Sequence, residues 1–380
     1  MNYALRIERI REKMAAKNVE GLFVANDASW EYFTGLPRAG FCQTKSRQNS
    51  AEFAGLLITP VKVTAFSPRL SALGFSDRME DFPVVDELVI YPDVDLYGKT
   101  FDQEIRAQKL NGKRLAVNRD ISSTLVLRLQ EVHDATVIDM SADVDMLRAV
   151  KDEDEIELMR YASSVADKIY YDILPMLVPG TPVREIELEI EKLLETYGCS
   201  SPSFPAEVLH HGPKAGIGVG AGYYERLERD HTIALDYGVV YKGYCSDFGR
   251  TIFLQEPTPE MVRAHELVMK SQAAGMEMMK AGVNTGADAN AAAHRCMEEA
   301  GMGEAFIHRL GHGIGKDVHE RPFLAEGEDT VLQAGMCFTV EPSLYVPQKY
   351  LIRVEDVVLV TSTGVECLNK VTKDIVVLDR

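Results

Sequence analysis

The sequence predicts an α/β (α+β) protein with a mixed-sheet N-terminal domain and a larger second domain built as a pseudo-twofold repeat. Three observations support this prediction. The chain has 380 residues, which is more than a typical single domain. Short strand-like runs alternate with helical segments over residues 1–147. Beyond that point, the same succession of helix, turn, helix and strands occurs twice.

The N-terminal domain, residues 1–147, is expected to hold one mixed sheet with flanking helices. Residues 3–18 have the apolar spacing of a helix, and further helical segments lie at 101–110 and 120–132. No residue pattern in this half points to a particular chemistry. The short strand-like runs are 21–26, 54–60, 63–68, 87–92, 114–118 and 135–140.

The second domain, residues 148–380, repeats a pattern of elements rather than a sequence. Asp152 and the acidic residues after it suit the start of a long helix. The helices are expected at 153–176, 183–198, 258–282 and 286–300, and strands follow the second and the fourth. The pattern predicts a pseudo-twofold domain whose strands gather at its middle.

Composition excludes some classes of function. A formal net charge of -17 argues against a nucleic-acid-binding protein, which usually presents a basic face. The six cysteines form no CxxC pair, which is typical of free thiols in a reducing compartment. The N-terminal segment lacks the apolar centre of a signal peptide, and no apolar run approaches the roughly 20 residues that cross a membrane. These features favour a cytoplasmic protein.

The stretch TIALDYGVVYKGYCSDFGRTIFL predicts a β-hairpin that brings two acids together. If Lys242 and Gly243 form the turn, Tyr241 faces Tyr244, and Asp236 and Asp247 lie diagonally on one face of the hairpin. Two carboxylates aimed together raise each other's pKa, and a metal ion would relieve that repulsion. An acid at a solvent-exposed strand edge explains this stretch equally well.

Two further acids and one histidine favour the metal site. Glu341 and Glu355 each interrupt a run that otherwise indicates a buried strand, and burying an unpaired charge is strongly unfavourable. His312 stands between glycines in GHGIG and is expected in a glycine loop. Four carboxylates, expected on four strands, and one imidazole would balance two divalent cations. This donor set suits Mn, Co, Fe(II) or Zn better than a structural zinc site of cysteines.

These motifs carry a resemblance to a known family. DYGVVYKGYCSDFGRT, HRLGHGIGKDVHERP, TVEP and RVEDVVLVT resemble the metal-ligand motifs of the pita-bread peptidases, which include aminopeptidase P, prolidase and methionine aminopeptidase. The N-terminal stretch RIERIREKMAAKNVEGLFVANDASWEYFTGL resembles the start of the creatinase-type domain, and LRAVKDEDEIELMRYA resembles its junction. The resemblance implies a creatinase-like N-terminal domain followed by a pita-bread catalytic domain.

The resemblance also implies roles for individual residues. Two divalent cations, with Mn preferred and Co, Zn or Fe as alternatives, would be held by Asp236, Asp247, His312, Glu341 and Glu355. A bridging hydroxide would attack the scissile amide of an Xaa-Pro peptide. Glu341 would relay a proton to the leaving nitrogen, and His319 would donate a hydrogen bond to the carbonyl oxygen. His308 and Arg353 would line the substrate pocket.

Three positions depart from the family pattern. The family histidine that contacts substrate falls on Val219 here, and His210 and His211 are the nearby candidates to replace it. Gly249 stands where threonine is usual, and Ser343 stands where glycine is usual. All five metal-ligand positions are kept, so these departures bear on the specificity for Xaa-Pro bonds.

Two other functions remain open at this stage. One is an enzyme on the same scaffold that acts on a non-peptide small molecule, as a creatinase-like or osmolyte hydrolase or lyase; the absent histidine at Val219 favours it. The other is a binding protein that has lost catalysis, which the complete ligand set disfavours. The resemblance further implies a homodimer that acts on small peptides or other small amides. The negative net charge and the lack of a long apolar run predict no nucleic-acid or membrane partner.

Overall fold

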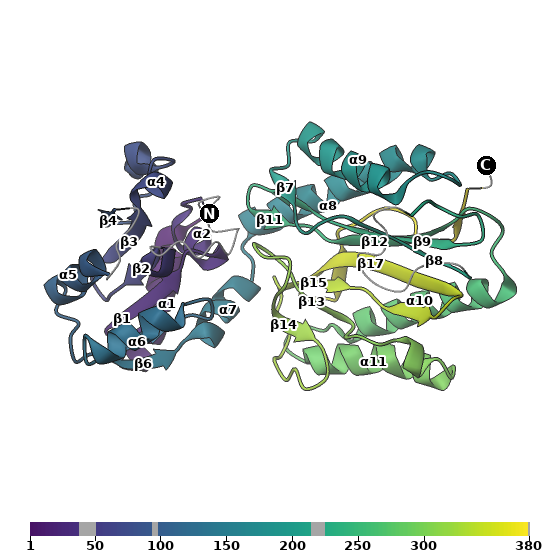
Figure 1. Cartoon of the computed structure of the whole chain (residues 1–380). Helices are drawn as coiled ribbons and strands as arrows, with labels where there is room; N and C mark the ends of the chain where they lie inside the picture. Colours follow the sequence, from purple (N-terminus) through teal and green to yellow (C-terminus); the bar gives the residue numbers. More distant parts are fainter. Residues whose placement is uncertain (38–50, 93–97, 214–224, 379–380) are drawn as a thin grey trace. The chain divides into compact units, whose positions relative to one another are not determined.

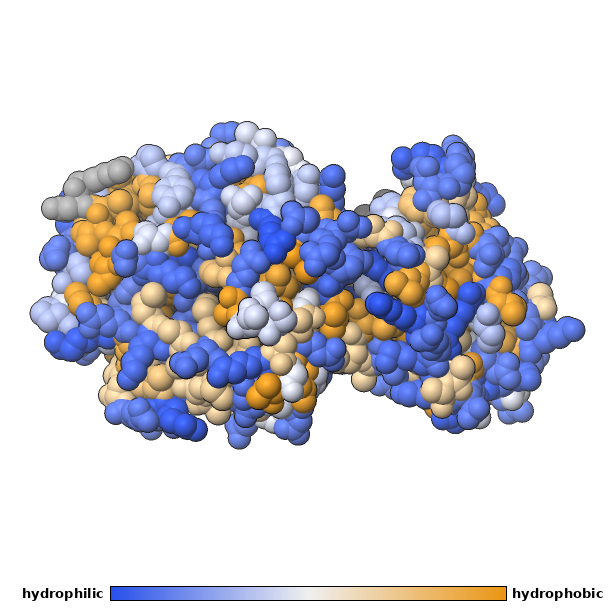
Figure 2. Space-filling view, turned by 180° about the vertical axis from the view of Figure 1, so that it is seen from behind, coloured by the Kyte–Doolittle hydropathy of each residue, from blue (hydrophilic) through white to orange (hydrophobic). Residues whose placement is uncertain are grey.

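The structure is a computed structural model that describes residues 1–37, 51–92, 98–213 and 225–378. The chain divides into two compact units, Met1–Arg148 and Ala149–Arg380 (Figure 1). Within the described ranges, no helix combines the length and the apolar character that crossing a membrane requires. Hydrophilic side chains alternate with small apolar areas on the face drawn in Figure 2, as expected for a surface that contacts water.

The first unit contains a six-stranded mixed sheet with helices packed on it. The sheet order is β4-β3-β2-β1-β5-β6; β1 pairs antiparallel with β2 and parallel with β5. Each of the six strands lies within two residues of its predicted range. The elements are α1 (Tyr3–Ala16), β1 (Gly21–Ala25), α2 (Ala28–Thr34), β2 (Gly55–Ile58), β3 (Val63–Pro68), α4 (Arg69–Ala72), β4 (Glu87–Tyr91), α5 (Lys99–Ala107), β5 (Arg114–Val117), α6 (Ser123–Glu131), β6 (Thr136–Asp139) and α7 (Ser141–Ala149).

The second unit is built on a large sheet whose main path runs β14-β13-β15-β17-β12-β9-β8. Strands from the first half of the unit fill one side of this order and strands from the second half fill the other, so the antiparallel pair β12–β17 lies at the junction. The strands are β7 (Ser201–Pro202), β8 (Glu207–His211), β9 (Thr232–Tyr237), β10 (Val239–Tyr241), β11 (Tyr244–Cys245), β12 (Phe248–Phe253), β13 (Gly311–Gly313), β14 (Glu320–Leu324), β15 (Cys337–Val340), β16 (Ser343–Val346), β17 (Tyr350–Val360), β18 (Val365–Cys367) and β19 (Val376–Val377).

Four helices accompany this sheet in two pairs, as the repeat predicts (Figure 1). Helix α8 starts at a capping box in which Asp152 and Glu155 satisfy each other's backbone N–H groups. Thr258 and Thr285 are the N-cap residues of α10 and α11, and each side chain accepts a hydrogen bond from a backbone N–H of the first turn. The helices are α8 (Glu153–Ile173), α9 (Val183–Thr196), α10 (Pro259–Met278) and α11 (Gly286–Glu299).

The two faces of the sheet have opposite chemistry because side chains alternate along each strand. On β9, Ile233, Leu235 and Tyr237 pack into the apolar cluster formed with α8 and α9. Asp236 therefore points to the other face. The predicted hairpin is confirmed: Tyr241 pairs with Tyr244, and Lys242 and Gly243 form the turn with φ values of 48° and 80°.

A buried ion pair fixes the central strands on the helix-covered face. The Arg250 guanidinium on β12 contacts the Asp356 carboxylate on β17 at 2.7 Å, and both side chains are almost fully buried. Arg250 also donates to the backbone carbonyls of Gly249 at 2.8 Å and Glu355 at 2.6 Å. This one guanidinium therefore holds the backbone of the strand that carries Glu355.

We expect Asp356→Ala to lower the free energy of unfolding by about 3–5 kcal/mol, because it leaves the Arg250 charge buried without its carboxylate. Lys373→Ala provides the matched control, since Lys373 binds the same carboxylate at 2.6 Å but is partly exposed, and its loss should cost less. Urea unfolding monitored by circular dichroism measures both. Equal losses for the two variants would contradict this account of the pair.

Candidate metal centre and active site

A row of facing residues crosses four neighbouring strands on the face away from the helices. Glu207 on β8 is paired with Asp236 on β9, Asp236 with Gly249 on β12, and Gly249 with Glu355 on β17. Paired residues in antiparallel strands point to the same face. A Cβ atom at position 249 would lie 2.9 Å from Glu355 Oε2, so glycine here leaves the room that this carboxylate occupies.

Asp247, His312 and Glu355 form the tightest cluster of metal-ligating side chains among the described residues. One ligand atom from each lies within 4.8 Å of the others, and all three side chains are buried. Asp247 Oδ1 and Glu355 Oε2 are buried without a hydrogen-bond partner in the described part of the chain. Buried carboxylate oxygens are normally satisfied, so these two fit a cation that they would share.

His312 is oriented by its own backbone. It lies on β13, a short strand with a register shift after His312, rather than in the loop expected from its glycines. Its Nδ1 lies 3.0 Å from the Gly313 carbonyl oxygen and donates to it. Nε2 is then left to face Asp247 Oδ2 at 3.5 Å and Glu341 Oε1 at 3.4 Å. A fixed tautomer with a free Nε2 is the usual state of a metal-binding histidine.

The acids reach the cluster from strands and from the breaks between strands. Asp236 and Glu355 lie within β9 and β17, as expected. The expectation of four strand positions was wrong for the other two: Asp247 lies between β11 and β12, and Glu341 lies between β15 and β16. At Asp247 the chain changes partner, because β11 pairs with β10 whereas β12 pairs with β9 and β17. At Glu341 the partner stays the same: β15 and β16 both pair with β17 in one register, and Glu341 lies in the short gap between them. Glu341 Oε1 accepts a hydrogen bond from Thr339 at 3.2 Å.

Burial makes it unfavourable for these acids to be ionised together. Burial raises the pKa of Asp236 to about 7, with the Arg353 charge opposing and the neighbouring carboxylates adding to the shift. Burial and nearby carboxylates also raise the pKa of Asp247 and hold the pKa of Glu355 well above its usual value. A multivalent cation removes this penalty.

Arg353 lies among the carboxylates on the same face. Its guanidinium forms a close ion pair with Asp236 Oδ2 and lies 3.9 Å from Glu355 Oε2. Its side chain is 15% exposed, so the charge sits at the rim of the cluster. The family resemblance leads us to expect Arg353 near the substrate; in the structure its charge offsets part of the cluster's negative charge.

The two remaining predicted histidines differ in environment. The His319 ring stands edge-on to the His312 ring, with centroids 4.1 Å apart, and the residue is exposed. Desolvation by the surrounding protein and the His312 charge lower the pKa of His319 to about 4, so its imidazole is neutral near pH 7 and keeps one N–H to donate. His308 has both nitrogens engaged: Nδ1 donates to the Arg309 carbonyl at 2.7 Å, and Nε2 accepts from Ser343 Oγ at 2.5 Å.

Residues 157–362 match the model of Metallopeptidase family M24, and residues 6–150 match that of the Creatinase/Prolidase N-terminal domain. The first match spans more than half of the chain. The chain belongs to metallopeptidase family M24. The large sheet with its two helix pairs is the pita-bread fold of this family, as predicted.

Several members of the family are similar to this chain over nearly its whole length. A curated Xaa-Pro dipeptidase of Pyrococcus furiosus is 27% identical, and the alignment covers 97% of this chain and 99% of that protein. The solved Xaa-Pro dipeptidase from Bacillus anthracis is 30% identical with a TM-score of 0.86, covering 99% of this chain and all of that one. The X-Pro aminopeptidase from Thermotoga maritima is 26% identical with a TM-score of 0.83, covering 98% and 99%.

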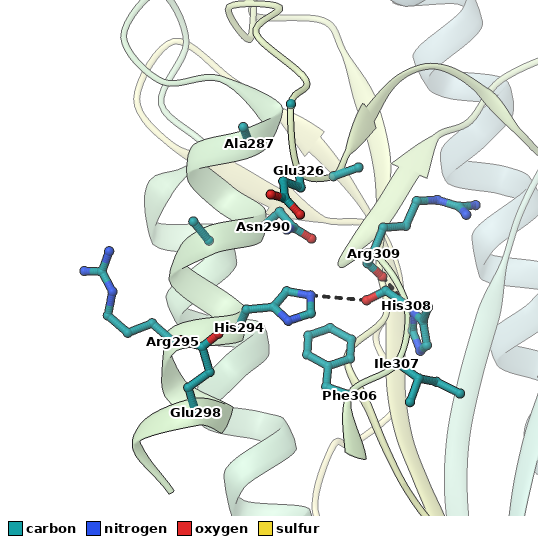
Figure 3. A pocket seen from close by; sticks show the side chains of 13 residues that line it. Ala287, Asn290, His294, Arg295, Glu298, Phe306, Ile307, His308, Arg309 and Glu326 are labelled. Atoms are coloured by element: carbon teal, nitrogen blue, oxygen red, sulfur yellow. Dashed lines mark hydrogen bonds between the residues drawn. The ribbon is translucent and has the colours of Figure 1, made fainter. Parts of the chain in front are cut away.

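A surface pocket lies beside His308 but does not include the carboxylate cluster. Asn290 and His294 of α11 and Phe306 are among its lining residues (Figure 3). The His294 ring stacks on Phe306 at 4.1 Å, and its Nε2 lies 3.2 Å from the His308 carbonyl oxygen, to which it donates. These contacts hold the backbone of His308 from behind, so we assign the pocket no part in the chemistry of this M24 peptidase.

The two candidates to replace the family histidine, His210 and His211, lie on opposite faces of β8. Val219 itself lies outside the described residues. The His210 side chain is buried and binds Glu225 Oε2 at 2.5 Å and His231 Nδ1 at 2.9 Å. His211 points to the same face as Asp236 and meets the Tyr345 ring edge-on, with centroids 5.3 Å apart. Of the two candidates, only His211 lies on the face of the carboxylate row.

Sequence analysis missed two features of this site. Glu207 was not singled out, although an acid that alternates with apolar residues in EVLHH was a usable signal. The hydrogen bond from Ser343 to His308 was also missed, since the two residues are far apart in the sequence. The five cysteines in the described ranges are free thiols, in agreement with their spacing; Cys42 lies outside those ranges.

The metal-depleted protein should lose stability as the pH rises from about 4 to about 7. Over this window folded Asp236, with its raised pKa, keeps a proton that the unfolded chain releases, so deprotonation favours unfolding. We expect a lower melting temperature at about pH 8 than at about pH 5 in chelator, and a weaker decrease in Asp236→Asn.

Asp120→Asn removes an exposed carboxylate of the first unit and serves as the control, which should keep the wild-type pH trend. Identical pH trends in Asp236→Asn and Asp120→Asn would show that Asp236 does not carry the effect.

Proposed function

We propose that the chain is a divalent-metal-dependent peptidase that cleaves Xaa-Pro bonds in small peptides. The observation that carries this proposal is the buried cluster of Asp247, His312 and Glu355, with two carboxylate oxygens that lack a hydrogen-bond partner, in a chain of family M24. Three relatives that match it almost end to end are named Xaa-Pro dipeptidases or an X-Pro aminopeptidase, which supports the substrate class.

The residues present fit a pair of divalent cations. Four carboxylates and one neutral imidazole offer hard oxygen donors and one nitrogen, a set that suits Mn²⁺ and also Co²⁺, Zn²⁺ or Fe²⁺. When bound, the cations polarise the scissile carbonyl and make water a stronger nucleophile near neutral pH. The proposed ligands are Asp236, Asp247, His312, Glu341 and Glu355.

Three other groups would then act on the substrate. Glu341, less deeply buried than its neighbours, would take a proton from the attacking water and deliver it to the nitrogen of the leaving proline as the C–N bond breaks. Neutral His319 would donate a hydrogen bond to the carbonyl oxygen as negative charge develops on it. Arg353 would bind a substrate carboxylate.

His308 would help to position the neighbouring backbone rather than bind substrate, because both of its ring nitrogens already form hydrogen bonds. This assignment departs from the substrate-binding role expected from the sequence. A cytoplasmic homodimer remains part of the proposal: light scattering at micromolar concentration should give twice the chain mass of 42.3 kDa, and a monomer would contradict it.

The decisive experiment is release of free proline from Xaa-Pro dipeptides and Xaa-Pro-Yaa tripeptides. We expect the wild type to release no proline after chelation and to regain activity when Mn²⁺ is added. Asp247→Asn and Glu355→Gln should neither regain activity nor retain metal. His319→Ala should keep its metal and lower kcat by about 10²–10³-fold. Glu260→Gln, at an exposed surface pair, is the control and should match the wild type.

The preference between dipeptides and tripeptides separates a dipeptidase from an aminopeptidase. Metal-loaded, folded protein that releases no proline would contradict the proposal. Non-peptide amides and osmolytes would then be the substrates to test, as the absent histidine at Val219 suggests.

A further inference from the structure

Strand β8 presents a second, unassigned set of side chains next to the carboxylate row. Val208 and His210 are buried on the face that packs toward the helices. Glu207, Leu209 and His211 alternate with them and are only partly buried. Because Glu207 is paired with Asp236, these three side chains lie on the same face as the proposed metal ligands.

Glu207 is a carboxylate without a hydrogen-bond or ion-pair partner within the described ranges. Burial raises the pKa of Glu207, and the charge of Arg353 opposes that shift, but the ion pairs of Arg353 are with Asp236 and Glu355. Glu207 is also outside the cluster of Asp247, His312 and Glu355. Its negative charge is therefore directed at a partly open surface beside the site where peptide cleavage is proposed.

Charge balance indicates what this carboxylate would meet. Two divalent cations would offset the four carboxylates proposed as ligands. Arg353 then remains as a positive group and Glu207 as a negative group on one face of the sheet, not paired with each other. A small peptide carries a carboxylate at one end and an ammonium group at the other, and opposite charges placed this way orient such a ligand.

We infer that Glu207 is a specificity-determining residue that binds a positively charged group of the Xaa residue, either its α-ammonium group or a lysine or arginine side chain. A carboxylate that accepts a hydrogen bond from such a cation forms a charge-assisted contact. Leu209 and the edge-on pair of His211 and Tyr345 offer apolar and aromatic surface beside it for the aliphatic part of the side chain. The inference rests on the proposed function.

The test compares Lys-Pro, Arg-Pro and Leu-Pro as substrates for the Mn²⁺-loaded wild type and for Glu207→Gln and Glu207→Asp. We expect Glu207→Gln to lower kcat/KM for a substrate whose cation it binds by roughly 10- to 100-fold, mainly through KM, because one charge-assisted hydrogen bond is lost. Glu207→Asp keeps the charge and should recover part of the loss.

The pattern of losses identifies the source of the cation. A loss confined to Lys-Pro and Arg-Pro assigns the side chain, and an equal loss with Leu-Pro assigns the α-ammonium group. Glu157→Gln is the matched control: Glu157 is an exposed carboxylate on α8 that pairs with Arg160 at 2.5 Å, so its removal should leave all three substrates unchanged.

Failure of this inference is distinguishable from failure of the proposed function. If the wild type cleaves all three dipeptides and Glu207→Gln cleaves them equally well, the role of Glu207 is overturned and the proposed peptidase function is retained. If the wild type cleaves none of them, the proposed function fails, and calorimetric titration of Lys-Pro into metal-depleted wild type and Glu207→Gln tests the contact directly. Equal affinity of the two proteins would overturn the inference.

Discussion

The constraint on which the catalytic unit depends is electrostatic. Asp236, Asp247 and Glu355 are buried beside the central strands, where each carboxylate opposes the ionisation of the others. Arg353 offsets part of this charge through Asp236, and His312 offers one neutral nitrogen. A buried set of this kind is stable in its ionised form only with multivalent cations. The stability of the fold and the proposed chemistry therefore both require bound cations.

The two faces of the sheet have separate roles: one packs against the helices, and the other carries the proposed ligands. The helix-covered face supplies apolar packing together with the Arg250–Asp356 pair, whose guanidinium also binds the Glu355 carbonyl. The open face carries the proposed ligands on the same strands. Alternation along β17 thus places Glu355 and Asp356 on opposite sides, one directed to the active site and the other to the scaffold. Stability and function depend on adjacent residues without competing for space.

Side chains outside the proposed ligand set surround it and would determine which substrates the site accepts. Ser343 donates a hydrogen bond to His308, which is why we propose a positioning role for that histidine. Arg353 and Glu207 leave one charge of each sign on the open face, and His319 offers a neutral donor. In this proposal the ligands supply the chemistry, and the specificity depends on side chains that the metal ions do not require.

The sequence by itself determined the six strands of the first unit, the four long helices of the second, the hairpin register that unites Asp236 and Asp247, and the set of acids proposed as ligands. These follow from local periodicity, turn chemistry and carboxylates in apolar strands, which act over short stretches of chain. Only the tertiary structure decided that Glu207, Gly249 and Glu355 share one row, and that Ser343 forms a hydrogen bond with His308. Pairing between strands distant in sequence decides these contacts, and no local pattern records it.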